Sequence, residues 1–366
     1  MRRIISVLLT ASIGVGLCSC SVRTEDTIEV DIGLITCDDN SLEIVRDNLA
    51  SWESEHPEYT VISRERVTDE DILSLAVMGA DHLPDVFIAN SQAGRLLESQ
   101  GLVTELTGIA SDVDSFNYDG GVYAFPVLRE SVSVIVYDPS VWSEGDPVGY
   151  NSDARFTVPN CYLSNVLSDD AAVNWFEHMV AGDGQASFTD DVFVEGLDIT
   201  RDLIRDDIAY GSDDELINAY VNGDCPAVTV YGNALFSLLN RLEEDNQDLY
   251  SRTGFATLTD GVVPMGYQYG VFVRTGMSEE RTSECIDLAR SLTEGTSSWN
   301  SDETTQRLVA LMDNSKTVPL YSLYFVPWVW NYASDECFFV MREEEKTSLE
   351  YSFVLQNCYE MYYIEN

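Results

Sequence analysis

The stretch that decides the fold is residues 27–62, TIEVDIGLITCDDNSLEIVRDNLASWESEHPEYTVI. Residues 28–34 alternate apolar side chains with polar or small ones, the period-two pattern of a strand. The pattern then changes to helical spacing, which predicts a helix with Asn40 as its N-cap and its end at Pro57. The face expected to be buried holds Leu42, Val45, Leu49 and Trp52. A second strand begins at Tyr59, so the stretch predicts a β-α-β unit.

The same alternation continues downstream. Thr68 is the expected cap of a helix over Ile72–Met78, and Val86–Ala89 is a short apolar strand. A further helix over Gln92–Gln100 stops at Gly101. This β-α-β-α-β-α order predicts an α/β fold with a parallel or mixed sheet and helices on both faces.

Ligands of open α/β sheets bind beyond the carboxyl ends of the strands. Polar residues stand at two such ends, in the segments 36–39 and 90–92. The candidates for ligand contact are Asp38, Asp39, Asn90 and Gln92. Helix capping is the alternative role for side chains at these positions.

After residue 118 the order of elements changes. A hairpin-like segment over 118–126 leads into an apolar strand, Val132–Tyr137, and then into about a hundred residues of mostly helical pattern. Strands at 226–232, 254–258 and 265–275 follow, and helices are expected at 278–293 and 301–312. Because no repeat or long linker appears, the length predicts about two domains joined by crossing strands.

The N-terminus has the layout of a secretory signal. Two arginines precede an apolar run over Ile4–Gly16, which is too short to span a bilayer. The following LCSC, residues 17–20, resembles the lipobox of bacterial lipoproteins, with Cys20 as the lipid-bearing residue. Residues 1–20 are therefore expected to be a lipoprotein signal peptide. The alternative is an ordinary signal with incidental cysteines.

Charge limits the partners. The chain carries 63 acidic and 20 basic residues, a net charge of −43, which disfavours nucleic acid and anionic lipid headgroups. Solubility explains most of this charge, and affinity for a cationic ligand is the alternative. The cysteines after the leader leave every disulfide pairing open: Cys37, Cys161, Cys225, Cys285, Cys337 and Cys358. The lack of C-x-x-C and the scattered histidines argue against a zinc site.

Five segments in order resemble the extracellular solute-binding proteins of ABC importers, the family 1, carbohydrate type. They are LASWESEHPEYTV from residue 49, LPDVFIAN from 83, YDGGVYAFPVLRESVSVIVYD from 118, YVNGDCPAVTVYGN from 220 and SEERTSECIDLARSLT from 278. The likeness runs from about Thr27 to Pro319.

This resemblance implies a two-lobe, type II periplasmic-binding-protein-like fold, in which each lobe is a mixed sheet flanked by helices and hinge strands join the lobes. Lobe 1 would comprise 27–127 plus 270–316, and lobe 2 would comprise 128–269 plus 317–366. The chain would cross from one lobe to the other near residues 125–128, 267–270 and 317–320. After Trp330 the sequence lacks the long terminal helices of many relatives.

Sugar sites combine hydrogen-bonding side chains with stacked aromatic rings. Residues at the expected lobe edges, above all in GYQYG at 266–270, are the candidates. Those expected to bind ligand are Asp38, Asp39, Asn90, Arg129, Glu130, Tyr231, Asn233, Tyr267, Gln268, Tyr269, Trp328 and Trp330, with Tyr321 and Tyr324 as further aromatic candidates. Trp52 and Trp175 are assigned to the core.

The function implied is capture of an extracellular sugar or oligosaccharide between the lobes and its delivery to ABC permease subunits. The protein would be an exported monomer, anchored to the outer face of the membrane by the lipid on Cys20, with no catalytic residue, metal or cofactor. Signature motifs for serine hydrolases, phosphate-binding loops and zinc proteases are absent from the sequence. The alternatives are a binder of a cationic solute, such as a polyamine or basic peptide, and a surface glycoside hydrolase or adhesin that reuses the fold.

Overall fold

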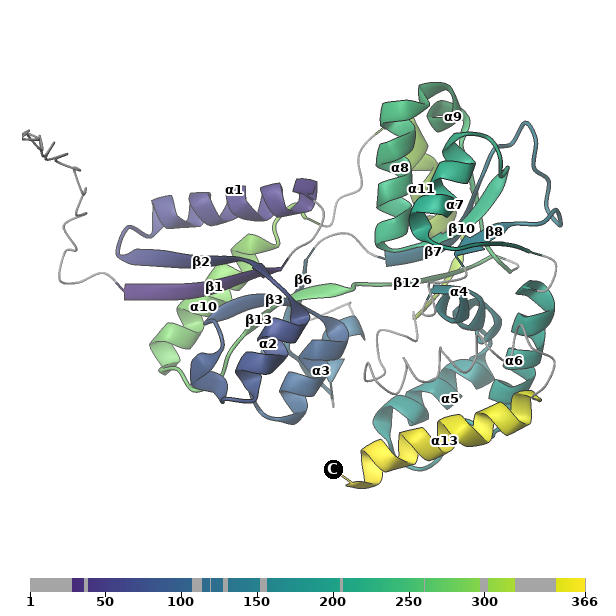
Figure 1. The fold of residues 1–366 in the computed structure, drawn as a ribbon. Helices are drawn as coiled ribbons and strands as arrows, with labels where there is room; N and C mark the ends of the chain where they lie inside the picture. Colours follow the sequence, from purple (N-terminus) through teal and green to yellow (C-terminus); the bar gives the residue numbers. More distant parts are fainter. Residues whose placement is uncertain are drawn as a thin grey trace, which may run out of the picture.

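The computed structural model describes residues 28–35, 39–106, 114–118, 120–127, 131–151, 157–204, 207–259, 261–296, 302–319 and 347–365. The chain forms two α/β lobes that lie side by side, each built around its own sheet (Figure 1). Within the described residues, no helix is long and apolar enough to cross a membrane.

The first lobe is built on a mixed sheet with the strand order β2-β1-β3-β13-β6. Its strands are β1 (Ile28–Ile35), β2 (Tyr59–Val67), β3 (Val86–Asn90), β6 (Ala124–Val127) and β13 (Tyr269–Val273). β1 runs parallel to β2 and β3, whereas β13 is antiparallel to both β3 and β6. The mixed sheet predicted from the β-α-β-α-β-α order is therefore confirmed.

Helices cover both faces of this sheet. They are α1 (Asp39–Glu55), α2 (Asp69–Ala76), α3 (Ser91–Ser99) and α10 (Glu279–Leu292), with the short η1 (Ala80–His82) and η2 (Asp114–Phe116) and the hairpin β4 (Asn117–Tyr118) and β5 (Gly121–Val122). The predicted apolar face of α1 is buried under the sheet, and the assignment of Trp52 to the core is confirmed. Thr68 caps α2 in a capping box with Asp71, as the sequence predicted.

The second lobe holds a sheet of seven described strands, in the order β14-β12-β7-β10-β8-β9, with β11 paired to β7. They are β7 (Ser131–Tyr137), β8 (Gly149–Asn151), β9 (Ile208–Tyr210), β10 (Ala227–Tyr231), β11 (Gly254–Ala256), β12 (Val262–Gly266) and β14 (Lys316–Pro319). Its helices are α4 (Thr157–Val166), α5 (Asp170–Ala181), α6 (Asp191–Ile204), α7 (Asp213–Val221), α8 (Asn233–Asp245), α9 (Gln247–Arg252), α11 (Glu303–Asp313) and α13 (Ser348–Glu365).

The expectation that the chain lacks a long terminal helix is wrong. α13 spans 18 residues and lies along α5 and α6 (Figure 1). Tyr351, Leu355 and Tyr359 are buried in the same apolar cluster as Trp175, which confirms the core assignment of that tryptophan. The sequence does not predict this helix clearly, because aromatic and apolar residues occur on all of its faces and no amphipathic period is visible.

The third crossing lies earlier than expected. The resemblance predicts α11 in lobe 1, but Leu308 and Met312 are buried in the core of the second lobe. The Tyr250 phenol donates to Asp302 at 3.0 Å, which fixes the start of α11 there. The chain therefore leaves the first lobe after α10 and has entered the second by Asp302. The chain also passes between the lobes after β6, which ends at Val127, and between β12 and β13.

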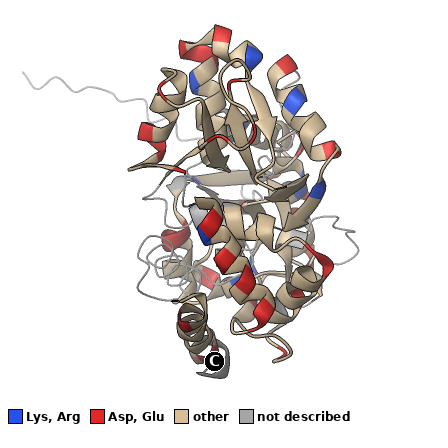
Figure 2. Ribbon diagram, turned by 90° about the vertical axis from the view of Figure 1, so that its right-hand side faces the viewer, with Lys and Arg blue, Asp and Glu red and all other residues tan. Residues whose placement is uncertain are grey.

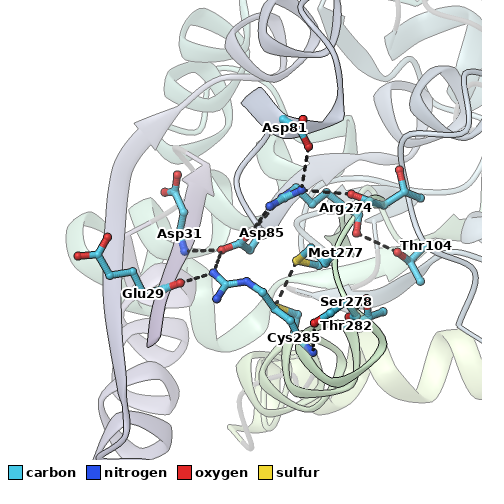
Figure 3. Close-up of polar contacts among 12 residues, drawn as sticks. Glu29, Asp31, Asp81, Asp85, Thr104, Arg274, Met277, Ser278, Thr282 and Cys285 are labelled. Atoms are coloured by element: carbon cyan, nitrogen blue, oxygen red, sulfur yellow. Dashed lines mark hydrogen bonds and ion pairs between the residues drawn. The ribbon is translucent and has the colours of Figure 1, made fainter. Parts of the chain in front are cut away.

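A buried carboxylate ties β3 to the elements around it. Asp85 is 4% exposed and lies between the guanidinium groups of Arg274, at 2.9 Å, and Arg281, at 2.6 Å (Figure 3). The same carboxylate accepts a hydrogen bond from the Asp31 amide at 2.9 Å. These bonds join β1, the residue before β3, the residue after β13 and α10, so they fix these elements of the first lobe against one another.

Candidate functional site

The two sheets approach each other at the segment between β12 and β13. On the first sheet, Tyr269 lies opposite Asn90 of β3 and Val127 of β6. On the second sheet, β12 ends with Gly266 opposite Ser131 of β7. Tyr267 and Gln268, the two residues between these strands, therefore stand where the edges of both lobes meet.

The segment 267–269, called the crossing segment below, is held to the first lobe by hydrogen bonds of its backbone. The Ser91 amide donates to the Gln268 carbonyl oxygen at 2.9 Å. The Tyr267 amide donates to Ser115 Oγ at 3.0 Å. Because its backbone is fixed, the segment presents the side chains of Tyr267, Gln268 and Tyr269 in defined positions, and each of them is half-buried.

Asn90 has a structural role at this edge. Its Oδ1 accepts from the Ala93 amide at 2.7 Å and caps α3, and its Nδ2 donates to Asp69 at 2.9 Å. Burial raises the pKa of the Asp69 carboxyl, against the opposing effect of the two hydrogen bonds from Asn90. The capping role considered for this position is therefore observed, and Asn90 shapes the edge on which a ligand would rest.

The second lobe brings the end of β10 and the start of α8 to the same place. Tyr231 pairs with Ser133 of β7, and Gly232 begins α8 with φ 53° and no side-chain cap. A Cβ atom at Gly232 would lie 3.3 Å from Ser131 Oγ and 3.6 Å from Gln268 Oε1. Only glycine fits this conformation easily, and its backbone lies close to the crossing segment. The first amide groups of α8 point out of the helix end, where a ligand oxygen can accept from them.

Three tyrosines belong to the segments that meet here, two on the first lobe and one on the second. Tyr267 and Tyr269 pack against the apolar clusters of the first lobe, and Tyr231 packs against those of the second. All three are half-buried, so part of each ring is open to solvent. Of the predicted site residues, Asn90, Tyr267, Gln268 and Tyr269 lie along the edge of the first sheet, Tyr231 is next to Gly232, and Asn233 is exposed in the first turn of α8.

Other predicted residues lie outside the described part of the chain. They are Asp38, Arg129, Glu130, Trp328 and Trp330, with Tyr321, Tyr324 and the lipidation candidate Cys20. Asp39 is the first residue of α1, and its side chain also lies outside the described set.

Sequence reasoning missed Ser131, Ser133 and Gly232. The serines alternate with valines in β7, so they share the sheet face opposite the valine side chains. Ser133 is fully buried, and its Oγ has no hydrogen-bond partner among the described atoms. The alternation SVSV over 131–134 is the local signal for these serines, since it places both on one face of the strand.

The surface of the protein is predominantly acidic. Acidic side chains are spread over the helices of both lobes, with few lysines and arginines between them (Figure 2). Among the described residues, no group of three or more histidine, cysteine or acidic side chains is arranged to hold a metal ion. Tyrosine hydroxyls, amides and helix amide groups provide hydrogen bonds at the crossing, which suits a neutral, hydroxyl-rich ligand.

Comparison with protein families gives one match. Residues 51–319 match the family model of the bacterial extracellular solute-binding proteins. No curated protein sequence matches the chain significantly.

Solved structures share the fold at low sequence identity. A chitin oligosaccharide binding protein superposes with a TM-score of 0.70 at 13% identity, over 93% of this chain and 100% of that chain. A family 1 extracellular solute-binding protein from Bifidobacterium longum subsp. infantis gives 0.69 at 11% identity, over 92% and 99% of the two chains. The GacH receptor of Streptomyces glaucescens, also solved with acarbose, gives 0.62 at 14% identity, over 92% and 99%. At this identity the similarity establishes a common two-lobe fold.

Proposed function

The chain belongs to the bacterial extracellular solute-binding proteins, and we propose that it captures a sugar or oligosaccharide between its lobes for delivery to an ABC permease. One observation carries this proposal. Tyr231 of the second lobe and Tyr267 and Tyr269 of the crossing segment are half-buried beside Gln268 and the start of α8. Aromatic faces and planar amides from two lobes are the chemistry that a carbohydrate ring requires.

The chemistry follows from the shape of a sugar. The C–H face of a pyranose is apolar and stacks on an aromatic ring, while the hydroxyl groups at its edge each donate and accept hydrogen bonds. The Gln268 amide offers both a donor and an acceptor, and the amide groups at the start of α8 offer donors. Similar structures include a chitin oligosaccharide binding protein, a maltose-bound protein and a receptor in complex with acarbose, which supports a carbohydrate here.

The arrangement explains how binding would be signalled. Tyr267 to Tyr269 are bonded to the first lobe, whereas Tyr231 and Asn233 belong to the second. A ligand that touches both sets stabilises the closed arrangement of the lobes, and a permease partner would distinguish that form from the open one. No covalent step is required. We further propose that the protein is exported and acts as a monomer, held at the outer face of the membrane by a lipid on Cys20.

A thermal-shift screen of the soluble protein beginning at Ser21 tests this function. The panel contains chito-, xylo- and malto-oligosaccharides, polyamines and short basic peptides. A ligand at about 100 times its dissociation constant adds roughly 2.7 kcal/mol to the free energy of unfolding, which raises the melting temperature measurably. Stabilisation by one class of sugar supports the proposal, and stabilisation by cations alone would contradict it. Release of reducing ends during long incubation would instead indicate a hydrolase.

A further inference from the structure

A cavity of about 930 Å³ lies in the second lobe, away from the crossing segment. It is bounded by the far end of β7, the following loop, the segment 255–259 with Gly261, and the last turn of α6. Tyr137 at its wall is separated from Ser131 at the crossing by six residues of extended β7, roughly 20 Å. The volume lies within the range of small-molecule sites. This cavity is therefore separate from the site proposed for sugar.

The charged groups among the described residues that line the cavity all have one sign. They are Glu144, Asp146, Asp202 and Asp207, and within the described part of the wall there is no lysine, arginine or histidine. The Asp207 carboxylate accepts from the Val148 amide at 2.9 Å and from the Tyr162 phenol, so it is fixed at the wall. Arg201 Nε lies 3.9 Å from Asp202, which is 73% exposed, but Arg201 itself does not line the cavity. Low-dielectric walls with one sign of charge concentrate the electrostatic field on a bound ion of the opposite sign.

The rest of the wall is apolar and partly aromatic. Tyr137 and Trp142 pack with ring centroids 4.8 Å apart, and Phe255 and Leu258 continue the same surface. Leu203, at the end of α6, is 39% exposed at this wall. A bare metal ion would leave this apolar surface unused, a neutral sugar would leave the carboxylates without an opposite charge, and an anion would be repelled by them.

We propose that this cavity binds a small organic cation, with an ammonium group directed toward the carboxylates and an apolar body against the Tyr137 and Trp142 side of the wall. The charge complementarity and the mixed wall together select this class over neutral and anionic ligands of the same shape. A cationic solute would then bind at a place distinct from the crossing segment, and sugar and cation could be bound at the same time.

The test uses three probes of matched shape: phenethylamine, phenethyl alcohol and phenylacetate. Calorimetric titration of the full exported protein should show saturable binding of the amine that weakens as salt is added. The alcohol should bind at least about tenfold more weakly, and phenylacetate should not bind, because only the amine supplies the charge that the carboxylates attract.

A matched pair of variants on α6 locates the binding. Leu203→Arg places a guanidinium at the cavity wall and should weaken amine binding at least about tenfold, because like charges repel. Ile199→Arg, one turn earlier and 50% exposed, adds the same charge outside the cavity and should change the affinity less than about twofold. Both positions are exposed, so both variants are expected to fold.

The proposal would be overturned by the absence of saturable amine binding, by equal binding of amine and alcohol, or by equal affinities in the two variants. The sugar site is tested independently, since a sugar that stabilises the wild-type protein should stabilise Leu203→Arg equally. Displacement of phenethylamine by that sugar would show that the two share one site, and it would also overturn the proposal.

Discussion

The backbone amide of Ser91 donates a 2.9 Å hydrogen bond to the carbonyl oxygen of Gln268, joining the start of α3 to the segment that crosses between the lobes. Tyr269, the next residue, pairs with Asn90 on the same sheet. The crossing segment is thus an extension of the first lobe. Any closing motion must bend the chain before Tyr267, and the tyrosines of this segment then move with the first lobe toward Tyr231 of the second.

The first prediction concerns the buried ion pairs of Asp85. Asp85→Asn removes the negative charge while Arg274 and Arg281 remain, so two partly buried cations lose their compensation. We expect the free energy of unfolding to fall by about 3–5 kcal/mol, as measured by urea denaturation.

Asp81→Asn is the matched control, because Asp81 also pairs with Arg274, at 3.7 Å, but is 92% exposed. An exposed pair contributes about 0–1 kcal/mol. Equal losses in Asp85→Asn and Asp81→Asn would show that the buried cluster contributes no more than a surface pair.

The second prediction is a pH dependence of stability from Asp138. The Arg252 guanidinium lowers the pKa of Asp138 from 3.8 to about 2. Burial of the carboxyl would raise this pKa, and hydrogen bonds from Ser140 to the carboxylate oppose that effect. Because this pKa is lower in the folded protein than in the unfolded chain, the stabilisation is fully present above pH 3.8. It is lost as the pH falls through about 2.

Asp138→Asn removes this titration. The gap in unfolding free energy between the wild-type protein and this variant should therefore shrink by about 1–2 kcal/mol between roughly pH 5 and pH 2, a range that allows for solvent screening at the half-exposed Arg252. Denaturant curves at a series of pH values measure it. A gap that stays constant over the range would show that Asp138 titrates normally.

The third prediction concerns α13, the helix that the sequence did not reveal. Leu355 is 1% exposed and packs with Trp175 and Phe188, so Leu355→Ala leaves a cavity and should lower the free energy of unfolding by about 2–5 kcal/mol. Leu349→Ala makes the same change on the same helix at a position that is 46% exposed, and it should cost less than about 1 kcal/mol. Similar losses from both would mean that α13 is not packed as described.

Much of the first lobe could be predicted from the sequence because each of its elements carries a local signal. The alternation over 28–34 marks β1, and the cap at Thr68 marks the start of α2. Gly101, with φ 68°, follows the end of α3 as expected. Local hydrogen bonds and apolar period, which can be inferred from neighbouring residues, decide these elements.

The placement of α11 and the existence of α13 could not be predicted in this way. α11 has a clear apolar face. The contact between Asp302 and Tyr250, two residues far apart in the chain, decides which of the two sheets covers that face. One face of α13 is buried by tertiary packing, and no local period of apolar residues marks that face in the sequence. At the candidate site, the flanking glycines are the local signal that makes Tyr267 to Tyr269 candidates. Ser133 was missed because its surroundings are set by a neighbouring strand.

The measurement that tests the central claim most directly is a calorimetric titration of the stabilising sugar into the wild-type protein, Tyr267→Ala, Tyr231→Ala and Phe353→Ala. Tyr267 and Tyr231 stand at the meeting of the lobes, whereas Phe353 is 56% exposed on α13. Loss of a stacking ring from either lobe should weaken binding by about tenfold, and Phe353→Ala should leave the affinity unchanged. Wild-type affinity in both tyrosine variants, with the fold intact, would contradict a sugar site between the lobes.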